Sequence, residues 1–137
     1  MNPITSVECL HGKFQGLRKT LREMPVELLD EFFRFRVRFL EEELQELKDA
    51  ETAADRVDAL ADLTIVAVGT LDAFGVDCSR AFWEVHRANM AKSPGIKPGR
   101  PNPFGLPDLV KPHGWSPPDH VDNVGEFARL FPGPEIQ

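Results

Sequence analysis

The sequence predicts an all-α protein with a proline-rich C-terminal extension. Apolar residues recur with helical periodicity through residues 25–50 and 53–75. No segment shows the alternation of apolar and polar residues that indicates a β-strand. Eight of the twelve prolines fall within residues 94–118, where no regular helix can continue. We therefore expect a four-helix-type bundle in residues 1–93, with residues 94–137 as an extension packed on the same domain.

Residue types that favour helix ends set the expected boundaries of the first three helices. A short helix is expected over residues 3–16. The second begins near Pro25, because proline suits the first turn of a helix, and continues to about residue 50. The third begins at residue 52 or 53 and ends at Gly75, since glycine is common just after the last turn.

The remaining chain is expected to hold one further long helix and one short one. The fourth helix covers residues 79–92, with Ser79 as its N-cap. Residues 94–118 are interpreted as an ordered or semi-ordered loop over the bundle, because large apolar side chains can anchor it; a mobile tail is the alternative. A last short helix is expected over residues 121–131, with Asp119 near its start.

Composition argues against several classes of protein. The chain has 137 residues and a formal net charge of −6, whereas a general nucleic-acid binder usually carries a basic patch. Cys9 and Cys78 form no Cys-x-x-Cys pair, so neither a disulfide framework nor a zinc site is indicated. Residues 1–12 do not resemble a secretory signal, and the apolar run 59–71 is too short to span a bilayer. We expect a cytoplasmic protein that binds neither nucleic acid nor membranes.

Three glutamates of the second helix lie where the helix should be apolar. On a helical wheel with Glu42 at zero, Glu46 and Glu43 lie at roughly 40° and 100°, in the sector of the preceding apolar residues. Like charges three or four residues apart repel each other, and an unpaired buried carboxylate is costly. A bound cation would relieve both effects. The alternative is a helix end that protrudes into water, with three solvated glutamates.

The third helix adds two carboxylates. Asp62 is the single charged residue within residues 59–71, and its neighbours are apolar on every side of the helix, so we expect it to be buried. Asp58 lies one turn earlier on the same face. The alternative is a solvated Asp58 and an Asp62 that pairs with a basic side chain. The candidates for that side chain are Arg36, Arg38 and Lys92.

Carboxylates from these two helices form a candidate metal site. Its members are Glu42, Glu43, Glu46, Asp58 and Asp62. Oxygen ligands favour Mg²⁺ or Mn²⁺ over zinc or copper, and Mg²⁺ usually keeps positions open for water and substrate phosphates. A di-iron site would need a Glu-x-x-His motif from each of two helices, and here Glu8 with His11 is one candidate without a second.

Three segments carry a resemblance to a known family: FLEEELQELKDA, VDALADLTIVAVGTLDAFGVD and FWEVHRANMAK. They are similar to the all-α nucleoside triphosphate pyrophosphohydrolases, which include MazG proteins, dimeric dUTPases and phosphoribosyl-ATP pyrophosphohydrolases. The small MazG-like or phosphoribosyl-ATP pyrophosphohydrolase-like proteins are the most similar branch. The resemblance covers residues 36–92 well and extends weakly to His11, Phe14 and the segment KPHGWSPPD.

The resemblance assigns family motifs to the acidic residues. The Glu-Glu-x-x-Glu motif falls on Glu42, Glu43 and Glu46, and the aspartate of a Glu-x-x-Asp motif falls on Asp62. Ala59 stands where the second motif has its glutamate, and Asp58, one residue earlier, could substitute for it. The number of metal ions, one or two, therefore stays open.

The same resemblance implies an activity. It implies Mg²⁺-dependent hydrolysis of a nucleoside triphosphate, a deoxynucleotide such as dUTP or dCTP, to the monophosphate and pyrophosphate. One glutamate would act as the general base; we choose Glu43, with Glu42 and Glu46 as the alternatives. The family's Asn-x-x-Lys motif falls on Asn89 and Lys92, which would contact the substrate, with Lys92 stabilising phosphate charge. The candidates for stacking on the base are His11, Phe14 and Trp83.

Two other functions fit the same residues. One is hydrolysis of phosphoribosyl-ATP. The other is a helical regulatory module that binds a metal or nucleotide without turnover, an alternative that the Ala59 departure leaves open. Wide apolar arcs on the second and third helices, together with the resemblance, predict a homodimer or homotetramer.

Overall fold

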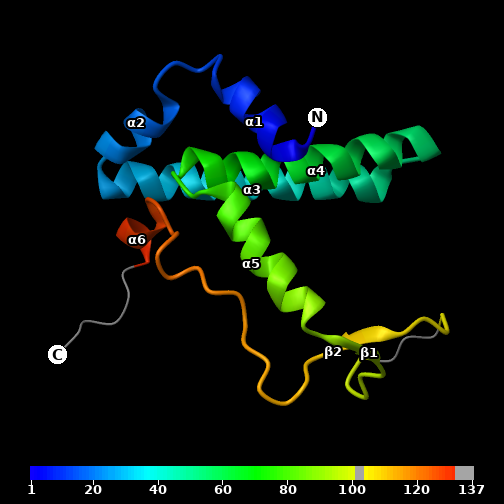
Figure 1. The fold of residues 1–137 in the computed structure, drawn as a ribbon. Coiled ribbons are helices and arrows are strands. Elements are labelled where there is room, and N and C mark those ends of the chain that lie inside the picture. The colour runs from blue at the N-terminus through cyan, green and yellow to red at the C-terminus, as the bar shows by residue number, and fades with distance from the viewer. Residues whose placement is uncertain (101–103, 132–137) are drawn as a thin grey trace. The chain divides into compact units, whose positions relative to one another are not determined.

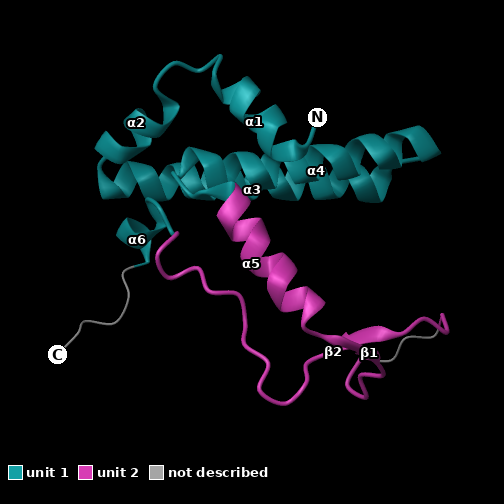
Figure 2. Ribbon diagram, in the orientation of Figure 1, with its two compact units in different colours: residues 1–78, 124–137 teal, residues 79–123 magenta. Residues whose placement is uncertain are grey.

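The computed structural model describes residues 1–100 and 104–131, and within them the chain is mainly helical (Figure 1). This confirms the predicted all-α class. Figure 2 divides the chain into two compact units, residues 1–78 with 124–137 and residues 79–123. Each unit is described by itself.

A hairpin of two long helices forms the frame of the first unit. α3 (Val26–Asp49) and α4 (Ala53–Ala73) lie side by side and contact each other along the hairpin (Figure 1). Thr52 caps α4, because its side chain accepts a hydrogen bond of 3.0 Å from the backbone N–H of Asp55. Both helices lie within two residues of their predicted bounds, so their prediction is confirmed.

Two short helices pack against α4 in the same unit. These are α1 (Pro3–His11) and α2 (Leu17–Glu23). The sequence predicted a single helix over residues 3–16, and this was wrong: α1 ends at His11, and α2 was not predicted at all. The chain turns at Gly16, whose φ of 76° is a left-handed conformation that glycine adopts without strain.

The core of the first unit is centred on Phe74, which follows α4 and is fully buried. Leu21 of α2 and Leu29 of α3 pack against it. The ring of Phe74 stacks on Phe127, with centroids 4.2 Å apart and planes 4° from parallel. Phe33 meets both rings edge-on. Aromatic packing therefore attaches the C-terminal segment to the helical hairpin.

The short helix α6 (Phe127–Leu130) is held by a close approach of two backbones. It is shorter than the helix predicted over residues 121–131, because Gly125 has a φ of 51°, which no α-helix interior allows. The next residue, Glu126, donates its backbone N–H to the carbonyl oxygen of Phe74 at 2.7 Å. A Cβ atom at position 125 would overlap that carbonyl oxygen, so the contact requires glycine.

The second unit combines a helix with a short β-hairpin. α5 (Cys78–Met90) leads into β1 (Ser93–Gly95), which pairs antiparallel with β2 (Asp108–Val110). α5 begins one residue before Ser79, the predicted N-cap. The expectation of no strand was wrong here, because strands of three residues are too short to show an alternating pattern.

None of the helices in residues 1–100 and 104–131 is, taken singly, both long and apolar enough to cross a membrane. Within the same described residues, α4 and α5 meet the requirement of length and composition when they are counted together, as a pair bent by 119°.

The backbone contact at Gly125 can be tested by substitution. Gly125→Ala should lower the free energy of unfolding by at least about 2 kcal/mol, because an alanine must take a left-handed conformation and its methyl group overlaps the Phe74 carbonyl. Urea denaturation followed by circular dichroism measures the change. Gly99→Ala is the control, since, apart from its chain neighbours, no atom of the described residues lies within 4 Å of the position of its Cβ. Equal stability of the two variants would contradict this account of the contact.

Candidate functional site

Three of the predicted carboxylates converge between the two long helices. Glu43 and Glu46 lie one turn apart on α3, and Asp62 lies on α4. Each offers an oxygen atom such that all three oxygens lie within 4.8 Å of one another. The packing of α4 along α3 brings residues from the two helices together. Three negative charges at this separation repel strongly unless a cation or protons compensate them.

Glu43 is the member of the cluster that water reaches least. Its residue is 8% exposed, and its Oε2 atom is buried without a hydrogen-bond partner in the described part of the chain. Burial raises the pKa of the Glu43 carboxyl, and the charges of Glu46, Asp62 and Glu42 raise it further. A buried, unsatisfied carboxylate oxygen calls for an explanation, and a bound ion is one of the usual ones.

The cluster fits a divalent cation that prefers oxygen ligands. Mg²⁺ binds oxygen at about 2.1 Å, so two ligands on opposite sides of one ion are about 4.2 Å apart. The three carboxylate oxygens, all within 4.8 Å, need only small side-chain movements to reach such an arrangement. The buried Oε2 of Glu43 would gain the partner that it lacks.

Two other predicted ligands lie outside this group of three. Glu42 and Asp58 are both exposed, and neither belongs to the set of close oxygens. Ala59, which stands at the position where the family motif has glutamate, is buried. Asp58 is close in sequence, but the structure does not bring it into the cluster.

The expectation that Asp62 is buried was wrong. Asp62 is accessible to solvent, because the first half of α4 is covered on one side by α3 while apolar side chains nearby remain exposed. No basic side chain among the described residues forms an ion pair with Asp62. Among these residues, no basic side chain paired with Asp62 therefore offsets its repulsion from the two glutamates.

Arg36 takes a different role from the one that the sequence allowed. Its guanidinium donates to the hydroxyl oxygen of Thr70 and to the carbonyl oxygen of Val66, both at 3.0 Å. Burial lowers the pKa of Arg36. The arginine thus ties α3 to α4 without neutralising the acidic cluster.

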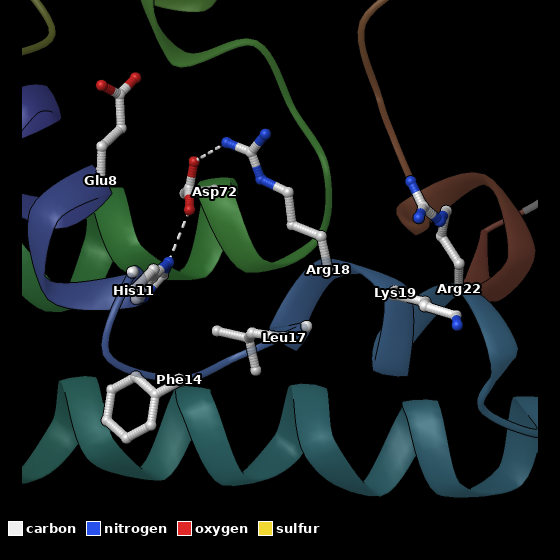
Figure 3. A pocket seen from close by; sticks show the side chains of 10 residues that line it. Glu8, His11, Phe14, Leu17, Arg18, Lys19, Arg22 and Asp72 are labelled. Atoms are coloured by element: carbon white, nitrogen blue, oxygen red, sulfur yellow. Dashed lines mark hydrogen bonds and ion pairs between the residues drawn. The ribbon is translucent and has the colours of Figure 1, made fainter.

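His11 lies in a separate pocket of the first unit, with a volume of about 510 Å³ (Figure 3). Its Nδ1 atom is 2.6 Å from Oδ2 of Asp72, and the guanidinium of Arg18 donates to the other oxygen of Asp72. Asp72 is buried, and its hydrogen bond raises the pKa of Arg18. The ring of Phe14 meets His11 edge-on, with centroids 6.5 Å apart. His11 and Phe14, both predicted as stacking candidates, therefore lie together beside the ion pair of Asp72 and Arg18.

Asp72 and Arg18 were missed in the sequence. Asp72 stands among apolar residues at the end of α4, and an acid there needs a partner, which is the signal that could have found it. Arg18 belongs to α2, which was not predicted. The pocket is lined by the acids Glu8 and Asp72, by the ring of Phe14 and by three basic residues (Figure 3). They are Arg18, Lys19 and Arg22.

The other predicted substrate contacts belong to the second unit. The ammonium group of Lys92 donates to the side-chain carbonyl oxygen of Asn89 at 3.1 Å, so the structure brings these two together. Trp83 is exposed and its ring lies 5.7 Å from that of His86. Within this unit, Trp83 is not part of the pair formed by Asn89 and Lys92.

Comparison with known proteins identifies the family. The family described as phosphoribosyl-ATP pyrophosphohydrolase matches residues 14–89, more than half of the chain. A search among curated proteins found no match. The matched segment contains all three carboxylates of the cluster. The chain therefore belongs to the phosphoribosyl-ATP pyrophosphohydrolase family of the MazG-like all-α pyrophosphohydrolases, enzymes that hydrolyse phosphoanhydride bonds.

Proposed function

We propose that the protein hydrolyses the bond between the α- and β-phosphates of a nucleoside triphosphate and releases the monophosphate and pyrophosphate. The substrate that we propose is a deoxynucleotide such as dUTP or dCTP. The observation that carries this proposal is the convergence of Glu43, Glu46 and Asp62. Carboxylates so arranged suit a cation that binds substrate phosphates. Membership of a pyrophosphohydrolase family supports the type of bond cleaved.

Mg²⁺ is the proposed cofactor, with Mn²⁺ as the alternative. Glu43, Glu46 and Asp62 would hold it, and Glu42 and Asp58 are proposed as outer members of the same site. When bound, the cation would polarise the phosphate oxygens and neutralise charge on the leaving group. The fit of the cluster to such an ion rests on its oxygen ligands and on the unpaired Oε2 of Glu43.

Glu43 is the proposed general base. It is the most buried carboxylate of the cluster, and burial raises its pKa, which favours acceptance of a proton. With Oε2 on the cation, the other carboxylate oxygen would accept the proton from a water molecule. That water would attack the α-phosphorus, the bond from phosphorus to the bridging oxygen would break, and pyrophosphate would leave. Lys92 and Asn89 are proposed to bind phosphate or sugar, because their side chains already interact.

Aromatic residues are proposed to bind the base of the nucleotide by stacking on it. His11 and Phe14 lie together in a pocket that also carries basic side chains, which supports a role in nucleotide binding. Trp83 remains a candidate because its ring is exposed and free to stack on a base.

Phosphoribosyl-ATP is the second candidate substrate, and the family match favours it. Hydrolysis of this nucleotide breaks the same kind of bond and releases the same leaving group. The acidic cluster serves both reactions equally, so the two substrates differ only in the groups that must be recognised beyond the phosphates.

A substrate panel tests the activity. The protein with Mg²⁺ should release pyrophosphate from one or more of the four deoxynucleoside triphosphates, the ribonucleotides or phosphoribosyl-ATP, as measured by a pyrophosphate-specific assay. Glu43→Gln and Asp62→Asn should each reduce turnover at least about 100-fold, because each removes a group from the site. Glu41→Gln, an exposed acid on the same helix, is the matched control and should keep full activity.

Two results would contradict the proposal. Release of orthophosphate without pyrophosphate would exclude cleavage between the α- and β-phosphates. Tight binding of a nucleotide or of Mg²⁺ without any product would instead favour the regulatory module.

Burial and the neighbouring carboxylates raise the pKa of Glu43, which predicts that Glu43→Gln stabilises the protein although it lowers activity. The pKa of Glu43 is raised in the folded protein, so its proton is held more tightly there than in the unfolded chain. The resulting stabilisation is present below the unfolded pKa and is lost as the pH rises through the folded pKa. In EDTA at about pH 8, Glu43→Gln should therefore raise the melting temperature, and at about pH 4 the advantage should disappear.

Magnesium should reverse the order of the melting temperatures of the wild-type protein and Glu43→Gln. Adding Mg²⁺ should raise the melting temperature of the wild-type protein, since a bound ion stabilises the folded state, but not that of Glu43→Gln. Differential scanning calorimetry measures both effects, with Glu41→Gln again as control. A lower melting temperature of Glu43→Gln in EDTA at about pH 8 would show that the acidic cluster is not under electrostatic strain.

We also propose that the protein is a homodimer or homotetramer. Large apolar side chains of α3 and α4 are exposed in the single chain, and such surfaces often mark interfaces. They are Leu28, Phe35, Leu44, Val57 and Leu60. A second copy would also cover the first half of α4, where Asp62 is accessible.

Substitution of one exposed phenylalanine tests this assembly. The wild-type protein should elute from gel filtration with light scattering at no less than twice its chain mass of 15.4 kDa. Phe35→Glu should shift it toward the monomer, because a charge at an apolar interface is costly. Val121→Glu, at an exposed apolar residue of the second unit, should leave the mass unchanged. A monomeric wild-type protein would refute the assembly.

A further inference from the structure

Two lysines of the second unit lie against the same tryptophan. The ammonium nitrogen of Lys92 is 5.4 Å from the centroid of the Trp115 ring, and that of Lys111 is 4.8 Å from it. Cations are attracted to the faces of aromatic rings at such distances. Lys111 and Trp115 lie in the proline-rich extension, beyond the segment that matches the family.

The strand pairing independently brings the two lysines to the same end of the hairpin. β1 and β2 pair antiparallel, with Ser93 opposite Val110. Lys92 and Lys111 are the chain neighbours of this pair, just outside the two strands. Like charges held near each other repel.

Neither lysine has an acidic partner to offset this repulsion. Within the described residues, no ion pair involves Lys92 or Lys111. The Lys92 ammonium group donates a hydrogen bond to the neutral side chain of Asn89. Lys97, in the same hairpin, differs because its ammonium group lies 3.8 Å from a carboxylate oxygen of Asp108. The two lysines therefore keep positive charges beside one tryptophan ring, and an anion bound there can neutralise them.

Trp115 is fixed at this position by the end of α5. Its indole N–H donates to the carbonyl oxygen of Ala88 at 2.7 Å, and Ala88 is buried. Nearby, Arg87 donates to the carbonyl oxygen of Pro117 at 3.0 Å. Glu84 accepts the backbone N–H of Asp119, also at 3.0 Å. The extension is thus bound to the helix that carries Asn89 and Lys92, and the ring cannot move independently of them.

We propose that Lys92, Lys111 and Trp115 form a binding site for the pyrophosphate group of the nucleotide. Lys111 binds a phosphate directly as a second cation, and Trp115 is a positioning residue that holds both lysines. The site rests on the proposed function, in which pyrophosphate is the leaving group. A group with two linked phosphates suits two separate ammonium groups, because each phosphate can accept from one of them.

Binding of pyrophosphate itself tests the site without any need for turnover. Isothermal titration calorimetry of the full chain in EDTA and low salt should show one pyrophosphate bound per chain. Lys111→Gln should weaken this binding about tenfold, the loss expected for one charge-assisted hydrogen bond. Lys111→Arg should restore most of it. Lys97→Gln is the matched control, since it removes the same charge from the same hairpin but from a lysine that already faces Asp108.

Two tryptophan variants test the positioning role. Trp115→Leu removes the aromatic face and should weaken binding as much as Lys111→Gln. Trp115→Phe keeps the face and loses only the donor to Ala88, so it should retain more of the affinity. Circular dichroism confirms that each variant is folded. An affinity for pyrophosphate that is unchanged in both Lys111→Gln and Trp115→Leu would overturn the assignment.

A comparison of two anions tests whether the site requires linked phosphates. Orthophosphate should bind more weakly than pyrophosphate, and equal affinities would overturn a site for linked phosphates. Failure of this inference is distinguishable from failure of the proposed function. Hydrolysis of nucleotides without pyrophosphate binding refutes the lysine site alone, whereas pyrophosphate binding without hydrolysis supports the site and refutes the activity.

Discussion

Electrostatic repulsion between carboxylates on two packed helices is the constraint on which the site depends. The close contact of α3 and α4 brings Glu43, Glu46 and Asp62 within 4.8 Å of one another. No basic side chain of the described chain pairs with Asp62, and Arg36, which is near in sequence, is used to join the helices. The hairpin therefore brings together negative charge that only protons or a cation can compensate.

The stability of the first unit comes from the other end of the same hairpin. Leu29 packs on Phe74 in the aromatic core, whereas Glu43 lies about 20 Å farther along α3. The core can therefore hold the two helices in register from a position well away from the acidic cluster. Gly125 and Phe127 add the C-terminal segment to this core, so residues far from the cluster help to keep its geometry.

Strand pairing and hydrogen bonds to α5 order part of the proline-rich extension. Its strands β1 and β2 pair with each other, and hydrogen bonds to α5 fix the segment around Trp115. Prolines exclude helices here but leave room for a short hairpin and for turns. The extension thereby brings Lys111 to the same tryptophan ring as Lys92, a residue that lies nineteen positions earlier in the chain. The family match ends at residue 89, so both lysines lie beyond the matched segment.

The sequence by itself determined the two long helices and the acidic cluster, because both follow from local spacing. Periodicity places Glu43 and Glu46 in the apolar sector of one helix, and Asp62 is the single charged residue of an apolar stretch in the next helix. Only the tertiary structure decided which carboxylates meet, that Asp62 is accessible, and that His11 pairs with Asp72. Helix α2 and the strands were missed for a related reason. Pairings between distant residues depend on packing and backbone turns, which single-residue patterns do not encode.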